Sequence, residues 1–227
     1  MTSANHDTCG TSTPSAATYS APMGIFMAFS TVEGWVSLSW YPFVYCAKVC
    51  AVTLSLAVFR TALADVRPAW RVVAPAIVTG LAVCVAWVGI DKVLPYPHLG
   101  ARVGFNPFGA MSSTGVALAF VTVRLYGLAL LVPVMEELFW RVFLLRYLTS
   151  ADFQSLGVEA FSWTAFWLVA VAFGLAHPEW LPAVLTACVY GLLLRRTRSV
   201  FAVIVAHAAT NAALAGYILL AHDWAYW

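Results

Sequence analysis

Charged residues are scarce in this chain. Of its 227 residues, 12 are Lys or Arg and 10 are Asp or Glu, while 62% are hydrophobic. Soluble domains have roughly 25% charged residues. So few charges cannot cover a water-exposed surface while so many apolar side chains are hidden. The composition excludes a soluble globule, a disordered chain and a fibrous repeat. It predicts an all-α, polytopic transmembrane helix bundle. The lipid bilayer would be both its solvent and one of its partners.

Other features are also missing. The net charge is only +2, and the densest basic cluster is the short run Arg195, Arg196 and Arg198. A nucleic-acid partner is therefore not expected. The five cysteines are odd in number and form no CxxC pair, so we interpret them as small apolar helix residues rather than as disulfide or metal ligands.

The first 20 residues contain no Lys or Arg. They therefore lack the basic start of a secretory signal peptide. Since they are rich in Ser, Thr and Ala, we predict that 1–20 is a disordered polar tail. We divide the remainder into N-terminal transmembrane helices over 21–113, a membrane core over 114–221 and a short C-terminal tail over 222–227.

Apolar stretches of membrane-spanning length predict seven or eight helices. Pro133 divides the fourth stretch, and 134–148 continues it as a helix with four charges. Three Arg-containing loops, near residues 60–71, 146–159 and 195–198, fall on one side if 114–148 crosses once, which predicts that this side is cytoplasmic. We expect a multi-pass protein of the cell membrane. The predicted spans are 21–38, which is weak, 41–59, 72–90, 114–132, 161–176, 181–194 and 200–221.

Several of the few charged residues lie close together in one apolar helix. Ionisable groups in a membrane span cost at least ~2.5–3.5 kcal/mol each on insertion scales, which makes them functional candidates. Glu137 and Arg141 are four residues apart, so they share a helix face and can pair. Glu136 is turned by about 100° from Glu137. We predict that Arg141 neutralises Glu137 and leaves Glu136 available. The alternative is a buried ion pair that only fixes helix packing.

Two further helices carry polar residues. His177 ends the stretch 161–176, and His207 and Asn211 lie one helical turn apart in 200–221. We expect these groups to meet the glutamates in one wet cavity. A buried glutamate can act as general base on water, and His207 and Asn211 can stabilise an oxyanion. HExxH, GxSxG and GxGD motifs are absent. A metal held by the two histidines and a glutamate ranks second as a mechanism.

Together these motifs resemble a known family. EExxxR at 136–141, FxxxH at 173–177 and HxxxN at 207–211 are similar to the three motifs of the CAAX-processing and bacteriocin-processing intramembrane proteases, also called the Abi or type II CAAX prenyl endopeptidase family. The likeness covers 114–221, about half of the chain. The stretch around Glu136 also resembles a bacterial CAAX protease-related subgroup found with exosortase systems.

The resemblance implies an intramembrane glutamic endopeptidase that needs no cofactor, with 114–221 as its catalytic membrane core. Glu136 would activate water with help from His177, while His207 and Asn211 would stabilise the oxyanion. The resemblance gives site support to Glu137, Arg141 and Phe173. Its substrate would be a membrane-associated peptide or protein, prenylated or carrying a sorting signal, and an exosortase-related system is a candidate partner. The oligomeric state is open.

Several alternatives stay open. The same cavity suits a non-proteolytic binding, immunity or assembly protein, and, less well, a proton-coupled transporter. His177 lies at the far end of its predicted span, so Glu136 meets it only if 114–148 is tilted or bent near Pro133, or if the topology is inverted. Arg124 either pairs with a carboxylate or extends to the membrane surface. Glu179 either orients His177 or is solvated.

Overall fold

A computed structural model describes residues 14–100, 102 and 104–227. Within this part of the chain every regular element is helical, which confirms the predicted all-α bundle. Counting Thr114–Thr149 as one continuous helix, seven long helices are present among the described residues, in agreement with the expected seven or eight. The α-helices are α1 (Ala16–Glu33), α2 (Tyr41–Val58), α3 (Val73–Val93), α4 (Pro107–Ala110), α5 (Thr114–Tyr126), α6 (Val132–Glu137), α7 (Leu145–Thr149), α8 (Trp163–Leu175), α9 (Trp180–Thr197) and α10 (Val200–Ala221).

The outer surface of the bundle is apolar, as a membrane protein requires. Four helices are long and apolar enough to cross a bilayer: Tyr41–Val58, Trp70–Val93, Thr114–Thr149 and Val200–Ala221. Large hydrophobic side chains point away from the protein on these helices, for example Leu54, Val85 and Leu220, which is 86% exposed. In a bilayer, lipid covers such side chains.

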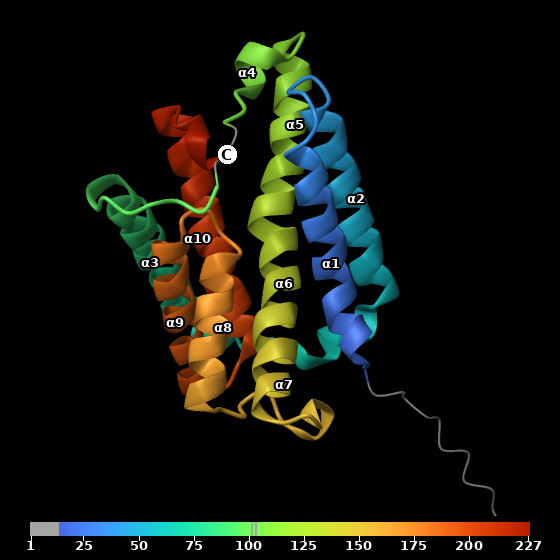
Figure 1. The fold of residues 1–227 in the computed structure, drawn as a ribbon, viewed down its shortest axis with the longest axis vertical. Coiled ribbons are helices and arrows are strands. Elements are labelled where there is room, and N and C mark those ends of the chain that lie inside the picture. The colour runs from blue at the N-terminus through green and yellow to red at the C-terminus, as the bar shows by residue number, and fades with distance from the viewer. Residues whose placement is uncertain (1–13, 101, 103) are drawn as a thin grey trace, which may run out of the picture.

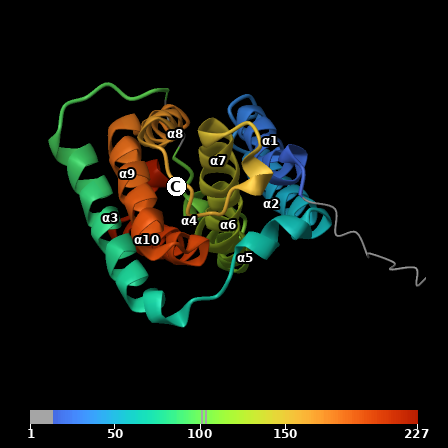
Figure 2. The same cartoon turned by 90° about the horizontal axis from the view of Figure 1, so that it is seen from below.

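Consecutive long helices run in alternating directions, so the three Arg-containing loops lie at one end of the bundle (Figure 1). Seen from that end, the long helix α5–α7 stands between two groups of helices (Figure 2). Helices α1 and α2 lie on one side, and α3, α8, α9 and α10 lie on the other. This arrangement agrees with the loop pattern from which we predict a cytoplasmic side.

Helices α3 and α10 approach each other closely at Gly80. A Cβ atom at this position would lie 2.2 Å from the backbone oxygen of Ala206, which is far inside van der Waals contact. Small residues permit such close approach in membrane bundles, where packing and hydrogen bonding drive helix association. The contact holds α10, and with it His207 and Asn211, against the bundle.

The helix from Thr114 to Thr149 is continuous through Pro133. Its first turn is capped by Ser113, whose Oγ accepts from the Val116 amide. Two π-helical segments, Gly127–Leu131 and Leu138–Leu144, flank the six-residue α6, which contains Pro133. Wide turns of this kind accommodate irregular positions inside a helix and are frequent at functional sites.

Helix α8 is shorter than the span predicted over 161–176. It begins at Trp163, with the side chain of Ser162 capping the Ala165 amide, and has 13 residues. At 1.5 Å per residue its length is about 20 Å, less than the roughly 30 Å hydrocarbon core. Helix α8 therefore ends within the bundle instead of at the opposite membrane face. Its bounds agree with the predicted span to within two residues, and His177, which follows it, lines the same cavity as Glu136.

The two ends of the chain also differ from expectation. Helix α1 begins at Ala16, so the predicted tail extends too far by residues 16–20, while 1–13 lie outside the described residues. At the other end, Tyr226 and Trp227 are buried. Lys92 donates to the carboxylate of Asp223 at 2.7 Å, and this hydrogen bond lowers the pKa of Asp223. The segment after α10 is thus folded against the bundle.

Candidate active site

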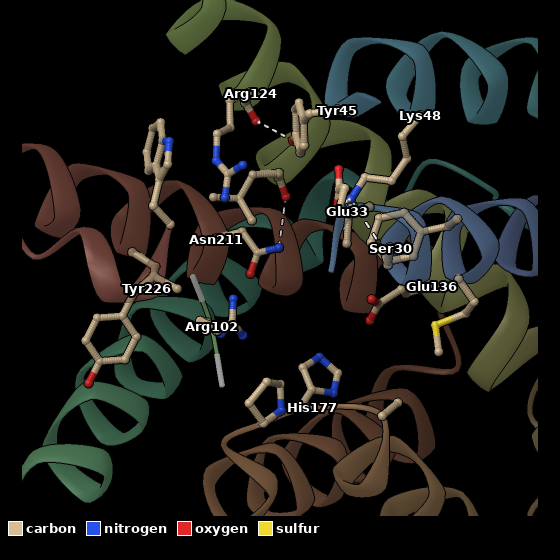
Figure 3. Close-up of a pocket in the computed structure, with 18 of the residues that line it drawn as sticks. Ser30, Glu33, Tyr45, Lys48, Arg102, Arg124, Glu136, His177, Asn211 and Tyr226 are labelled. Atoms are coloured by element: carbon tan, nitrogen blue, oxygen red, sulfur yellow. Dashed lines mark hydrogen bonds and ion pairs between the residues drawn. The ribbon is translucent and has the colours of Figure 1, made fainter. Parts of the chain in front are cut away.

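A cavity of about 450 Å³ lies between the long helix and its neighbours. Four of the predicted catalytic residues and Phe173 line it, and they come from three different parts of the sequence (Figure 3). Glu137 and Arg141 are not among the lining residues and lie fully buried behind them. The cavity therefore brings the three motifs together, as the sequence predicts. The predicted residues in its wall are Glu136, Phe173, His177, His207 and Asn211.

The carboxylate of Glu137 is hydrogen-bonded to two side chains, Arg141 and His207. Its Oε1 accepts from Arg141 Nη1 at 3.0 Å and from His207 Nδ1 at 2.8 Å. The side chain of Glu137 has no exposed surface, and that of Arg141 is 1% exposed. Because one carboxylate oxygen joins α6 to α10 through His207, this network fixes the two helices and neutralises Glu137.

Glu136 is bound quite differently. Its residue is 5% exposed, and its Oε2 is buried with no hydrogen-bond partner in the described part of the chain. The same side chain points into the cavity (Figure 3). The second oxygen of Glu137 is also without a hydrogen bond, but it does not face the cavity. Glu136 is thus the carboxylate that remains available, which matches the prediction from helix geometry.

The imidazole of His177 is oriented by the turn that precedes it. Its Nδ1 lies 2.7 Å from the backbone oxygen of Phe173. A carbonyl oxygen only accepts, so Nδ1 carries the proton and the neutral ring keeps its lone pair on Nε2. The ring stacks on Phe173 with centroids 4.5 Å apart and meets Trp87 edge-on at 5.7 Å. Phe173 therefore fixes both the plane and the tautomer of His177.

His207 and Asn211 lie in the cavity wall, but part of their donor capacity is already used. His207 Nδ1 is bonded to Glu137, and Asn211 Nδ2 donates to the backbone oxygen of Leu128 at 2.9 Å. Leu128 belongs to the π-helical segment Gly127–Leu131, so the wide turn supplies the acceptor that positions this amide. His207 Nε2 and the second N–H of Asn211 remain for a ligand.

A second layer supports His207. Its ring packs against Tyr190 at 5.4 Å between centroids. Tyr190 Oη lies 2.6 Å from Thr210 Oγ1, and Thr210 donates its single proton to the Gly80 or Ala206 oxygen. Tyr190 is therefore the donor in the first bond. Sequence reasoning missed Tyr190 and Thr210. Thr210 lies beside Asn211, but its link to Tyr190 depends on how α9 and α10 pack.

The N-terminal helices contribute the opposite wall. Lys48 on α2 forms a 2.5 Å ion pair with Glu33 on α1, and its side chain is 7% exposed. Arg124 on α5 also lines this wall. The sequence signal for all three is the same as for the motifs, namely a charge within an apolar helix, but it does not reveal which charges pair.

A loop covers the turn that holds His177. Leu99 donates its amide to the Pro178 oxygen at 2.9 Å. Arg102 reaches both carboxylate oxygens of Glu179 at 2.8 Å, and Glu179 is 4% exposed. Glu179 is therefore a buried anchor for this loop, neither solvated nor hydrogen-bonded to His177.

The histidines and glutamates of the cavity do not form a ready metal site. Among residues 14–100, 102 and 104–227, no three His, Cys, Asp or Glu side chains lie in an arrangement that holds a metal ion.

Comparison with known families gives a match over the region that contains this site. The family model described as "Type II CAAX prenyl endopeptidase Rce1-like" matches residues 108–213. Over this stretch the chain is similar to the CAAX protease family. The match spans just under half of the sequence and includes all three motifs of the cavity, from Glu136 to Asn211. The family match and the four helices that are apolar enough to span a membrane support an intramembrane protease of the CAAX type, a hydrolase that acts on a peptide or protein. Neither the curated proteins nor the solved structures give a match.

Proposed function

We propose that the chain is a glutamic endopeptidase, in which Glu136 activates water for attack on a peptide bond in the membrane. The observation that supports this most is the contrast between the two adjacent carboxylates. Glu137 is neutralised by Arg141 and His207, whereas the Glu136 carboxylate faces the cavity with an unpaired oxygen. A general base must be free to accept a proton from its water.

The steps follow from the positions of these groups. Glu136 takes a proton from the water, and the hydroxide attacks the carbonyl carbon of the substrate. The neutral His177 helps to hold the water through its Nε2 lone pair. His207 and Asn211 donate to the developing oxyanion, for which the His207 ring needs a proton on Nε2 besides the one on Nδ1 that it donates to Glu137. Glu136 then returns the proton to the leaving amine as the carbon–nitrogen bond breaks.

The direct test is cleavage by the Glu136→Gln variant. The substitution keeps the shape of the side chain and removes its basicity, so we expect kcat to fall by about 10²–10⁴-fold while the protein still inserts into membranes. Glu159→Gln is the matched control, because Glu159 is an exposed loop residue away from the cavity. Full activity of Glu136→Gln contradicts the proposal.

The cellular substrate is sought with the same pair of variants. Membrane peptides that accumulate with Glu136→Gln but not with Glu159→Gln identify it, whether they are prenylated CAAX sequences or sorting signals. If the Glu136→Gln protein instead preserves the whole cellular phenotype, the non-proteolytic binding or immunity role replaces the enzyme. Residence in the cell membrane and a link to an exosortase system stay predictions that fractionation and co-purification test.

A further inference from the structure

Arg124 is a buried cation in the cavity wall that the proposed mechanism does not use. It lies on α5, is 8% exposed, and its guanidinium points into the cavity opposite His177 (Figure 3). The residue thus presents a positive charge to whatever enters the site.

The contacts of Arg124 leave that charge uncompensated. Its Nη1 donates to the Tyr41 hydroxyl, and its guanidinium carbon lies over three aromatic rings, at 5.5 Å from Tyr41, 4.7 Å from Tyr45 and 4.9 Å from Trp227. Its Nε is buried without a hydrogen-bond partner in the described part of the chain. Aromatic faces attract a cation, but they do not neutralise it.

Other cations of the bundle interior differ in this respect. Within the described residues each of them has a carboxylate, and Glu33, which lies in the same wall as Arg124, is already paired with Lys48. Arg124 forms no ion pair in that part of the chain. An unpaired charge in a membrane span is unfavourable, and a guanidinium has a fork of donors that fits a carboxylate. The buried paired cations are Lys48 with Glu33, Arg141 with Glu137 and Arg146 with Asp65, and the exposed Arg102, which also lines the cavity, pairs with Glu179.

Arg124 and Glu136 are on the same continuous helix, twelve residues apart. Their backbone separation is therefore about 18 Å. An extended peptide advances about 3.3 Å per residue, so a substrate cleaved at Glu136 reaches Arg124 within about five residues of the cleaved bond.

We propose that Arg124 binds a carboxylate of the peptide substrate, within about five residues of the bond that is cleaved. This inference rests on the proposed function. The carboxylate is either the free C-terminus of the peptide or an Asp or Glu side chain near it. Arg124 is then the residue that selects which peptides enter, while Glu136 cleaves them.

A measurement of peptide binding, rather than of cleavage, tests the role of Arg124 independently of the proposed role of Glu136. The probe is a fluorescent farnesylated CAAX peptide, prepared with a free C-terminal carboxylate and as the C-terminal amide, and titrated onto full-length Glu136→Gln protein in lipid nanodiscs. We expect the acid to bind at least about tenfold more tightly than the amide, as charge-assisted hydrogen bonds do. The further change Arg124→Gln removes this preference, and Arg124→Lys retains part of it.

Controls separate recognition from folding. Arg71→Gln removes an exposed arginine and leaves the preference for the acid intact. A merely structural role of Arg124 would weaken the binding of acid and amide equally. An amide peptide with Asp in its last three residues identifies the second source, because it regains the affinity if a side-chain carboxylate is the ligand.

The outcomes distinguish this inference from the proposed function. If Glu136→Gln still cleaves peptide, the glutamate mechanism fails, yet the acid-to-amide ratio still judges Arg124. If peptide carboxylates bind no better than the amide, or if Arg124→Gln keeps the full preference, the inference is overturned.

Discussion

The two walls of the cavity contain similar charges in different arrangements. On the motif wall, Glu137 joins Arg141 and His207, and the unpaired group is an anion, Glu136. On the N-terminal wall, Glu33 joins Lys48, and the unpaired group is a cation, Arg124. Each wall thus contains one ion pair and one charged group that forms no ion pair within the described residues. The difference in sign teaches that the cavity is polarised along the long helix, which carries a base at Glu136 and, about three turns away, an anion receptor at Arg124.

The largest effect is expected where a fully buried partner is lost. Arg141→Met leaves Glu137 buried beside His207 without its cation, and breaking such a pair costs about 3–5 kcal/mol. Unfolding of the purified protein in detergent measures the loss. The double variant Glu137→Gln/Arg141→Met should recover much of it. If Arg141→Met is as stable as the wild type, the motif wall is not held by this ion pair.

A smaller loss is expected on the N-terminal wall. The side chains of Lys48 and Glu33 are 7% and 13% exposed, against 1% and 0% for Arg141 and Glu137. Water therefore reaches Glu33 more easily when its partner is removed, and we expect Lys48→Met to cost about 1–3 kcal/mol. The same unfolding measurement compares the two walls. A larger loss for Lys48→Met than for Arg141→Met would reverse their ranking.

The support behind His207 should contribute less than either pair. Tyr190→Phe removes one buried hydrogen bond to Thr210 and keeps the ring against His207, so we expect a cost of about 0.5–1.5 kcal/mol. Activity should fall modestly, in kcat more than in KM, because the change loosens an oxyanion donor and not the peptide site. A drop as large as that of Glu136→Gln would place Tyr190 in the chemistry itself.

No effect is expected from metal removal. The proposed mechanism uses the chain's own residues, so treatment with a chelator should leave cleavage of a CAAX-type peptide unchanged. Peptide cleavage before and after dialysis against EDTA is the measurement. Reversible loss with recovery on added zinc would revive the metal mechanism and would change the role of the motif wall from base to ligand set.

Whether a feature of the site could be predicted from the sequence depends on how far apart along the chain the interacting residues are. The pairing of Glu137 with Arg141 and the separate direction of Glu136 follow from helix geometry within one turn, and both are observed. The depth of His177 does not follow, although α8 (Trp163–Leu175) nearly coincides with the predicted span 161–176. Hydropathy records composition, and it does not record how one helix packs against another.

The sequence also does not predict which charged residues on different helices form ion pairs, because this depends on how the helices pack. Lys48 and Glu33 are fifteen residues apart on different helices, and Arg102 and Glu179 are 77 apart. Nothing in their local patterns says which opposite charge they meet. That Arg124 forms no ion pair within the described residues is equally a property of the packed bundle.

The π-helical segment Gly127–Leu131 has a consequence for helix phase. In an uninterrupted α-helix, residues twelve apart such as Arg124 and Glu136 point in directions that differ by about 120°. A π-turn accommodates one extra residue, which reduces the difference to about 20°. The π-helical turn therefore changes the helical phase so that Arg124 and Glu136 both point toward the same cavity. Shortening that segment by one residue would rotate one of them away while leaving every motif in the sequence intact.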